Sequence, residues 1–154
     1  MTAEAPAPAP LRPAFHALKT RLIEVKELMP RARFAEVAPF PIERPLRLGV
    51  VPMGSADGLL HLHAGRMLVR GRAVPLLGAP SLEHTRLDLT AVPEARVGDE
   101  VVVIGRQGEA EITGADAAAN HGLQTLHVAP AIGERVARVY LSGGAVASVV
   151  TRGA

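Results

Sequence analysis

The sequence predicts a mostly β fold, a small β-barrel with one short helix near residues 113–121. Short runs of alternating apolar and polar residues recur along the chain, and Gly and Pro separate them at most junctions. Apolar residues make up 48% of the 154 residues, which is enough for one sizeable core. Only 3% of the residues are aromatic, so Val, Leu, Ile and Ala must fill that core.

The beginning of the chain differs in composition from the rest. Residues 1–10 are a Pro/Ala tract that favours extended polyproline conformations, because proline lacks a backbone N–H. We expect a disordered tail there and a β domain over residues 11–154. The tail contains neither a basic region nor an apolar signal segment, and no later stretch has the length of a membrane span. A soluble, cytoplasmic protein without a membrane partner is expected.

Two strands are predicted in the first third of the domain. Apolar residues of segment 15–28 also fit one helical face, but the alternation over residues 23–26 favours a strand. Residues 44–52 become continuously apolar towards their end and then stop at a proline. This pattern predicts a strand that is buried on both faces near its end.

A hairpin and a further strand are predicted next. Residues 66–70 and 72–77 are two strand-like runs separated by Gly71, which can occupy a tight turn. Pro75 within the second run predicts an edge strand or a bulge, because proline cannot donate to a strand ladder. Residues 86–90 alternate strictly and predict another strand.

The following segments predict a buried strand and then the helix. Residues 97–105 form a turn followed by a continuous apolar run, and residues 105–108 resemble a hairpin turn more than a phosphate loop, since no helix follows directly. An alanine run favours the helix over residues 113–121, where Thr113 can cap the first turn together with Asp116.

The last strands are predicted over residues 135–140 and 145–150, on either side of a Gly-Gly turn. Alternation over the first of these would place Arg135 and Arg138 on opposite faces of one strand. Arginines in such positions are more often solvated or paired with carboxylates than used as anion sites.

Composition excludes several function classes. The 17 basic and 15 acidic residues leave a formal charge of +2 and are interspersed, so no nucleic-acid partner is expected. The absence of cysteine removes disulfides and thiolate chemistry. Lys19 and Lys26 are the only lysines, and both lie in a segment that we interpret as a strand, which offers poor candidates for Schiff-base chemistry.

Five segments in this order resemble the C-terminal β domain of alanine racemases. They are residues 11–26, 47–58 with the run Val-Pro-Met-Gly-Ser-Ala-Asp-Gly, 97–105, 111–113 with the helix after it, and 135–140. The resembling enzymes use pyridoxal phosphate and combine an N-terminal barrel with this β domain. The resemblance covers roughly residues 11 to 140 and implies the β-barrel fold, but it leaves the barrel and its cofactor lysine outside the chain.

The resemblance also implies which residues would border a substrate. The family's acid/base tyrosine corresponds to Ser55, its Met-Asp pair near the substrate corresponds to Leu82 and Glu83, and its phosphate-holding tyrosine falls near Leu126. A serine hydroxyl lacks useful basicity without a partner base, so the site at Ser55 is degenerate and no residue is expected to be catalytic in the chain alone. Gly54, Ser55, Asp57, Leu82 and Glu83 remain candidates for the substrate border.

Two histidines offer a weaker candidate site. His61 and His63 would share one face of a strand, where they could bind a metal or activate Ser55 as in a hydrolase. A solvated loop between glycines explains them better, and no metal is expected. Asp57 lies in a Gly-flanked turn, where a short carboxylate usually bonds to its own backbone, so we assign it a structural role.

The function expected from these observations is an accessory or partner subunit of a pyridoxal-phosphate-dependent amino-acid racemase. A racemase-type barrel protein would complete it, and the chain would bind no cofactor by itself because it lacks a phosphate-binding loop. The alternative is a non-catalytic module that forms a homodimer or larger oligomer, or that binds a small ligand.

Overall fold

The structure is a computed structural model that describes residues 15–30, 40–59, 65–121 and 125–152. Its strands are β1 Leu18–Arg21, β2 Glu24–Leu28, β3 Leu46–Val51, β4 Arg66–Val69, β5 Arg72–Pro75, β6 Thr85–Asp88, β7 Glu100–Gln107, β8 Ala110–Ile112, β9 Arg138–Ser142 and β10 Ala145–Val150. Its helices are the 3-10 turn η2 Ser55–Asp57, α1 Gly114–His121 and α2 Thr125–Ala131. The expected mostly β fold is confirmed.

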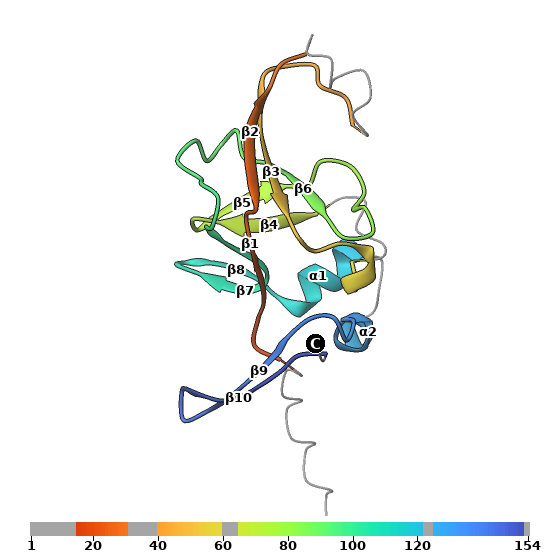
Figure 1. Cartoon of the computed structure of the whole chain (residues 1–154), viewed down its shortest axis with the longest axis vertical. Helices are drawn as coiled ribbons and strands as arrows, with labels where there is room; N and C mark the ends of the chain where they lie inside the picture. The colour runs from red at the N-terminus through yellow and green to blue at the C-terminus, as the bar shows by residue number, and fades with distance from the viewer. Residues whose placement is uncertain (1–14, 31–39, 60–64, 122–124, 153–154) are drawn as a thin grey trace, which may run out of the picture.

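Two antiparallel sheets form the body of the domain (Figure 1). One has the order β1-β7-β4-β5, with β8 added to the end of β7, and the other has the order β2-β3-β6. A bridge between Leu76 and Leu87 joins the edge of the first sheet to the edge of the second. At the opposite edges, β1 and β2 follow each other directly along the chain, so the sheets close around a common core as a small barrel.

The segment predicted as one strand over residues 15–28 contributes one strand to each of the two sheets. β1 pairs with β7, and β2 pairs with β3. At the junction the backbone N–H of Leu22 donates to Asp99 O (3.0 Å) and that of Ile23 donates to Val50 O (2.9 Å). The strand assignment is therefore confirmed, and the structure adds a corner at Leu22–Ile23 where the chain leaves one sheet for the other.

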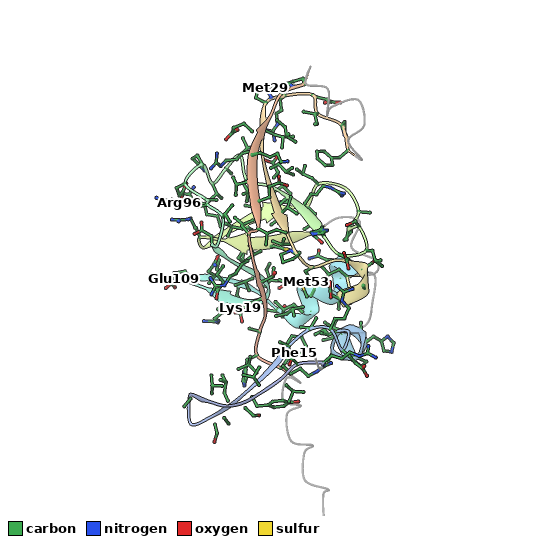
Figure 2. The ribbon with its side chains drawn as sticks, in the orientation of Figure 1. Phe15, Lys19, Met29, Met53, Arg96 and Glu109 are labelled. Atoms are coloured by element: carbon green, nitrogen blue, oxygen red, sulfur yellow. The ribbon has the colours of Figure 1, made fainter. Side chains whose placement is uncertain are left out.

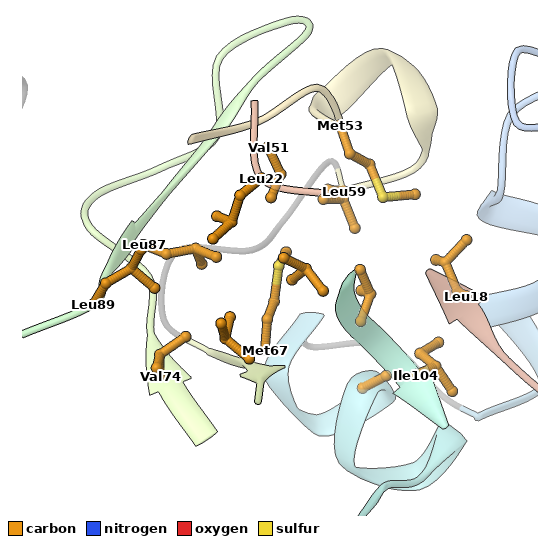
Figure 3. Packing of buried hydrophobic residues seen from close by; sticks show 14 of the residues in the cluster. Leu18, Leu22, Val51, Met53, Leu59, Met67, Val74, Leu87, Leu89 and Ile104 are labelled. Atoms are coloured by element: carbon orange, nitrogen blue, oxygen red, sulfur yellow. The ribbon is translucent and has the colours of Figure 1, made fainter. Parts of the chain in front are cut away.

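The main core lies between the two sheets and consists of aliphatic side chains and methionines (Figure 3). Met67, Val74 and Leu87 are fully buried there, and they come from β4, β5 and β6. Met53 also points into this core, whereas Met29 lies at the exposed tip beyond β2 (Figure 2). The low aromatic content predicted this type of packing.

The turn chemistry read from the sequence is confirmed at the first hairpin. β4 and β5 are joined at Arg70 and Gly71, which have φ values of 51° and 74°. Positive φ at both central residues is the geometry of the type I′ turn that joins twisted strands most readily. Pro75 lies at the end of β5, the edge strand, as the missing N–H of proline requires.

The helical part differs from the expectation of a single helix. α1 begins as predicted: the Thr113 Oγ1 accepts from the backbone N–H of Asp116 (3.1 Å), and Asp116 Oδ2 accepts from the backbone N–H of Thr113 (2.8 Å). The hydrogen bonds to Thr113 hold the pKa of the Asp116 carboxyl below its ordinary value. α2 is a second helix, which packs against α1. The sequence did not predict α2, because the segment contains Pro130 and lacks capping residues.

The last predicted strands form a separate two-stranded sheet, β9–β10. β9 begins at Arg138, so the prediction that Arg135 and Arg138 share one strand is wrong. Residues 133–136 form a turn instead, in which the N–H of Val136 donates to Gly133 O (3.3 Å). Among the described residues, no helix is long and apolar enough to cross a membrane.

Candidate functional site

Three loops converge at the end of β3, and they bring the predicted substrate-border residues together. The first contains η2 and its flanking glycines, residues 54–58. The second is residues 81–84, and the third is residues 131–135, which follow α2. In the second loop the Ser81 hydroxyl donates to His84 O (3.1 Å) and accepts from the N–H of His84 (3.1 Å), which fixes its shape.

Backbone hydrogen bonds join the first loop to the second. The N–H of Ser55 donates to Ser81 O (2.9 Å), and the N–H of Ala56 donates to Leu82 O (3.0 Å). Gly54 is required at this junction, because a Cβ there would lie 2.4 Å from Ser81 O. The contact places Ser55 beside the loop that carries Leu82 and Glu83. The sequence-based grouping of these residues is thus reproduced by the geometry of the loops.

Asp57 has the structural role that the sequence predicted. Its side chain is buried, and Oδ2 accepts from the backbone N–H of Gly54 (2.9 Å), which closes the turn. The third loop adds to this turn, since the N–H of Gly133 donates to Asp57 O (3.2 Å). Gly58 completes it with φ of 109°, and a Cβ there would lie 2.3 Å from Ala131 O. All three loops therefore interlock around Asp57.

Arg135 is the functional candidate that sequence reasoning missed. Its Nε lies 3.5 Å from Asp57 Oδ1, and its Nη2 lies 3.3 Å from Glu83 Oε1. The guanidinium thus bridges carboxylates from the first and second loops. Sequence patterns predicted only that Arg135 is solvated or paired with some carboxylate, and the separation of 52 residues between Glu83 and Arg135 gives no local sign of the pairing. The cluster of two carboxylates and one guanidinium carries a formal charge of −1.

The rim of the site combines apolar and polar groups. Leu82 is 65% exposed in the second loop and precedes Glu83, the partner of the half-exposed Arg135. A small apolar pocket lies behind Asp57 and is lined by Leu18, Val128 and Ile132, but it is too small to hold an amino acid. The described residues of this surface therefore do not enclose a pocket of the size that a small-molecule site needs.

The described residues do not assemble a cofactor site. Lys19 and Lys26 are engaged in ion pairs on β1 and β2, with Glu100 (3.0 Å) and Glu24 (2.5 Å) respectively. No group of three His, Asp or Glu side chains in the described part of the chain could hold a metal ion. His61 and His63 lie outside the described residues, and of Leu126 only its place in α2 is described. The residues present here do not fit pyridoxal phosphate by themselves.

Comparison with known proteins identifies the family. The family described as "Alanine racemase, C-terminal domain" matches residues 15–140. The chain belongs to the alanine racemase C-terminal domain family. An alanine racemase from Desulfosudis oleivorans is 43% identical over 141 residues, which is 89% of this chain and 35% of the relative. One from Halothermothrix orenii is 34% identical over 124 residues, covering 79% of this chain and 33% of the relative.

Solved racemase structures share the fold of this C-terminal domain. The alanine racemase from Bacillus anthracis with bound L-Ala-P superimposes with a TM-score of 0.79 at 26% identity, over 88% of this chain and 35% of that chain. The biosynthetic alanine racemase from Pseudomonas aeruginosa gives a TM-score of 0.67 at 33% identity, over 78% of this chain and 33% of the other. The chain therefore spans about a third of the length of the curated relatives it matches.

Proposed function

We propose that this C-terminal domain acts as a partner subunit of a pyridoxal-phosphate-dependent amino-acid racemase. A racemase-type barrel from outside these 154 residues holds the cofactor, and the chain is inactive by itself. The observation that carries the proposal is the interlocked loop framework around Asp57 in a member of the racemase family. The framework would hold the substrate-border residues in place, but it carries Ser55 where the family has its acid/base tyrosine.

The chemistry of Ser55 supports inactivity of the chain alone. A serine hydroxyl exchanges protons with a carbon acid only when a base activates it. Within the described residues the Ser55 hydroxyl has no side-chain hydrogen-bond partner, and the nearby Asp57 carboxylate is occupied by Gly54 and Arg135. Pyridoxal phosphate would supply the electron sink for racemisation when held by the barrel. The residues of this chain would orient and enclose the substrate.

Glu83 and Leu82 are the residues that we place at the substrate entrance. Glu83 is held by Arg135, so its carboxylate has a fixed position and a partner for its charge. Leu82 presents an exposed apolar side chain beside it. This pair would favour a small zwitterionic substrate, whose ammonium group meets a carboxylate and whose short side chain meets an apolar surface.

The test is a pull-down of the tagged protein from a lysate of its source cells, compared with the purified chain alone. We expect the purified chain to be colourless and inactive, and the complex to show cofactor absorbance and to racemise alanine. A colourless oligomer of this chain alone, without any active complex, would refute the proposal. It would support the alternative of a non-catalytic oligomeric or ligand-binding module.

Variants of the entrance extend the test to the residues. Leu82→Ala and Glu83→Ala should each lower the racemase activity of the complex several-fold without preventing its formation. Glu109→Ala is the matched control, because Glu109 is exposed on the β7–β8 turn, away from the three loops (Figure 2). Equal activity of all three complexes would remove Leu82 and Glu83 from the substrate border.

A further inference from the structure

The hairpin of β9 and β10 projects beyond the two sheets of the barrel (Figure 1). Every residue of both strands is exposed, although the hairpin contains four valines, a leucine and the single tyrosine of the chain. Two-stranded hairpins without a covering surface are marginally stable in water, since neither face is buried. An extended apolar surface of this kind typically marks a binding site.

A β-bulge sorts the apolar side chains of the hairpin onto one face. Val139 pairs with Val149 and Leu141 pairs with Val146, and the register shifts between Val146 and Ser148 so that Ala147 has no partner. Because paired residues share a face and residues two apart on β9 do too, these four side chains lie on the same side. Without the bulge, Val146 and Val149 would lie on opposite faces. We call this set, Val139, Leu141, Val146 and Val149, the apolar face.

The four members of the apolar face are 54%, 58%, 62% and 55% exposed, in the order of the sequence. The opposite face is mixed and contains Arg138, Tyr140 and Ser148. No acidic residue follows Glu134 in the sequence. The apolar face thus has the composition of an interface centre, with charge confined to its surroundings.

The base of the hairpin is fixed next to the three loops. The guanidinium of Arg138 donates to Ile132 O (3.2 Å), and Arg152 lies 3.4 Å from a carboxylate oxygen of Glu134. Residues 133–135 between these contacts carry the bonds of Gly133 and Arg135 to Asp57. A protein seated over the base of the apolar face, at Val139 and Val149, would therefore lie close to the loops that carry the substrate-border residues.

We infer that the apolar face of β9–β10 docks the cofactor-binding barrel of the racemase. The inference rests on the proposed function, and it names the surface through which this domain would bind the barrel. Relatives match this chain over only about a third of their length, so two thirds of each relative lies outside this domain and is the candidate for what covers the apolar face. The exposed hairpin beside the substrate border is the surface that such a protein would cover.

Photocrosslinking tests the surface directly. The variant Val149→p-benzoylphenylalanine carries the probe on the apolar face, and Ser148→p-benzoylphenylalanine is the matched control on the opposite face. After irradiation in source-cell lysate, borohydride reduces an internal Schiff base to a stable pyridoxyl-lysine, adding hydride to the C=N carbon and a proton to nitrogen. We expect a crosslinked product with a pyridoxyl label from position 149, and at least tenfold less from position 148.

Other products would overturn the inference. A crosslink from position 149 to a second copy of this chain would assign the apolar face to a homo-oligomer. A crosslink to a protein without the pyridoxyl label, equal labelling from both positions, or no crosslink would each mean that the barrel does not cover this face.

A second pair of variants separates this inference from the proposed function. Leu141→Asp with Val149→Asp places charge on the apolar face, and Tyr140→Asp with Val150→Asp places the same charge on the opposite face. All four residues are exposed, so both variants should fold, as circular dichroism would verify. We expect the first variant to lose at least tenfold of the captured racemase activity and the second to stay within twofold of the native chain. Equal capture by both would refute the docking surface alone, whereas an inactive pull-down with the native chain would refute the proposed function.

Discussion

Replacing Asp57 tests whether its hydrogen bond or its charge stabilises the three-loop framework. In Asp57→Ala the backbone N–H of Gly54, which donates to Asp57 Oδ2 at 2.9 Å in a buried position, loses its acceptor. A buried donor without a partner costs about 1–3 kcal/mol. The ion pair to Arg135 adds about 0–1 kcal/mol, because the arginine is half exposed and lies 3.5 Å away.

The sum predicts that Asp57→Ala lowers the free energy of unfolding by about 2 kcal/mol and Tm by about 4–8 °C for a domain of this size. Asp57→Asn is the decisive comparison, because its amide oxygen can still accept from Gly54 while the charge is gone. It should cost about 1 kcal/mol or less, as should Arg135→Gln. The two effects are separable because the carboxylate uses a different oxygen for each.

Urea unfolding followed by far-ultraviolet circular dichroism measures these differences, with the denaturant slope as a check that the unfolded state is unchanged. The reasoning would be refuted if Asp57→Asn were as destabilising as Asp57→Ala. The charge, and therefore the pairing with Arg135, would then dominate the framework.

Three further perturbations follow from the fold. Gly58→Ala should lower the free energy of unfolding by about 2 kcal/mol or more, because φ is 109° and the new Cβ would collide with backbone atoms. Gly108→Ala, at φ of 61° in open space, should lower it by only about 1 kcal/mol. Thermal melts of the two variants measure the difference. Met67→Ala should cost about 2–5 kcal/mol in urea unfolding, and a loss below 1 kcal/mol would mean that the core collapses around it. The hydrogen bond from Arg70 lowers the pKa of Asp99, so this carboxylate stabilises the fold above its unfolded pKa of about 4, and the contribution is lost as the pH falls through the lower folded value. The urea midpoints of the native chain and Asp99→Asn should therefore approach each other between pH 6 and pH 3, and a constant gap would contradict the role of this pair.

Local patterns were sufficient for most strands. β3 and β7 were predicted because a long apolar run between turn residues has few alternatives to a strand buried on both faces. The turn at Gly71 and the cap at Thr113 were predicted because each depends on a few adjacent residues. In these places the sequence determines the backbone over a short distance.

The features that were missed depend on contacts between distant segments. The corner at Leu22–Ile23 exists because Asp99 and Val50 accept hydrogen bonds from neighbouring residues there, and neither partner is visible from the segment itself. The bridge of Arg135 between Asp57 and Glu83 has the same origin. The bulge at Ala147 was hidden too, since a register shift appears only once both strands are paired.

The position of the candidate site was predicted better than its geometry. The resemblance grouped Gly54, Ser55 and Asp57 with Leu82 and Glu83, and the loops place them side by side. Whether they border a substrate remains a prediction. The sequence could not indicate that the turn of Asp57 is also the attachment point of the loop leading to β9.

The strand that turns the corner at Leu22–Ile23 also constrains the order of folding. β1 is synthesised well before its partner β7, in which Val102 pairs with Lys19. The barrel therefore cannot close until residues near 107 have been synthesised, and loop-closure entropy delays the pairing further. Until then the apolar side chains of β1 have no partner strand, so we expect the unfinished domain to be more prone to aggregation than the closed barrel.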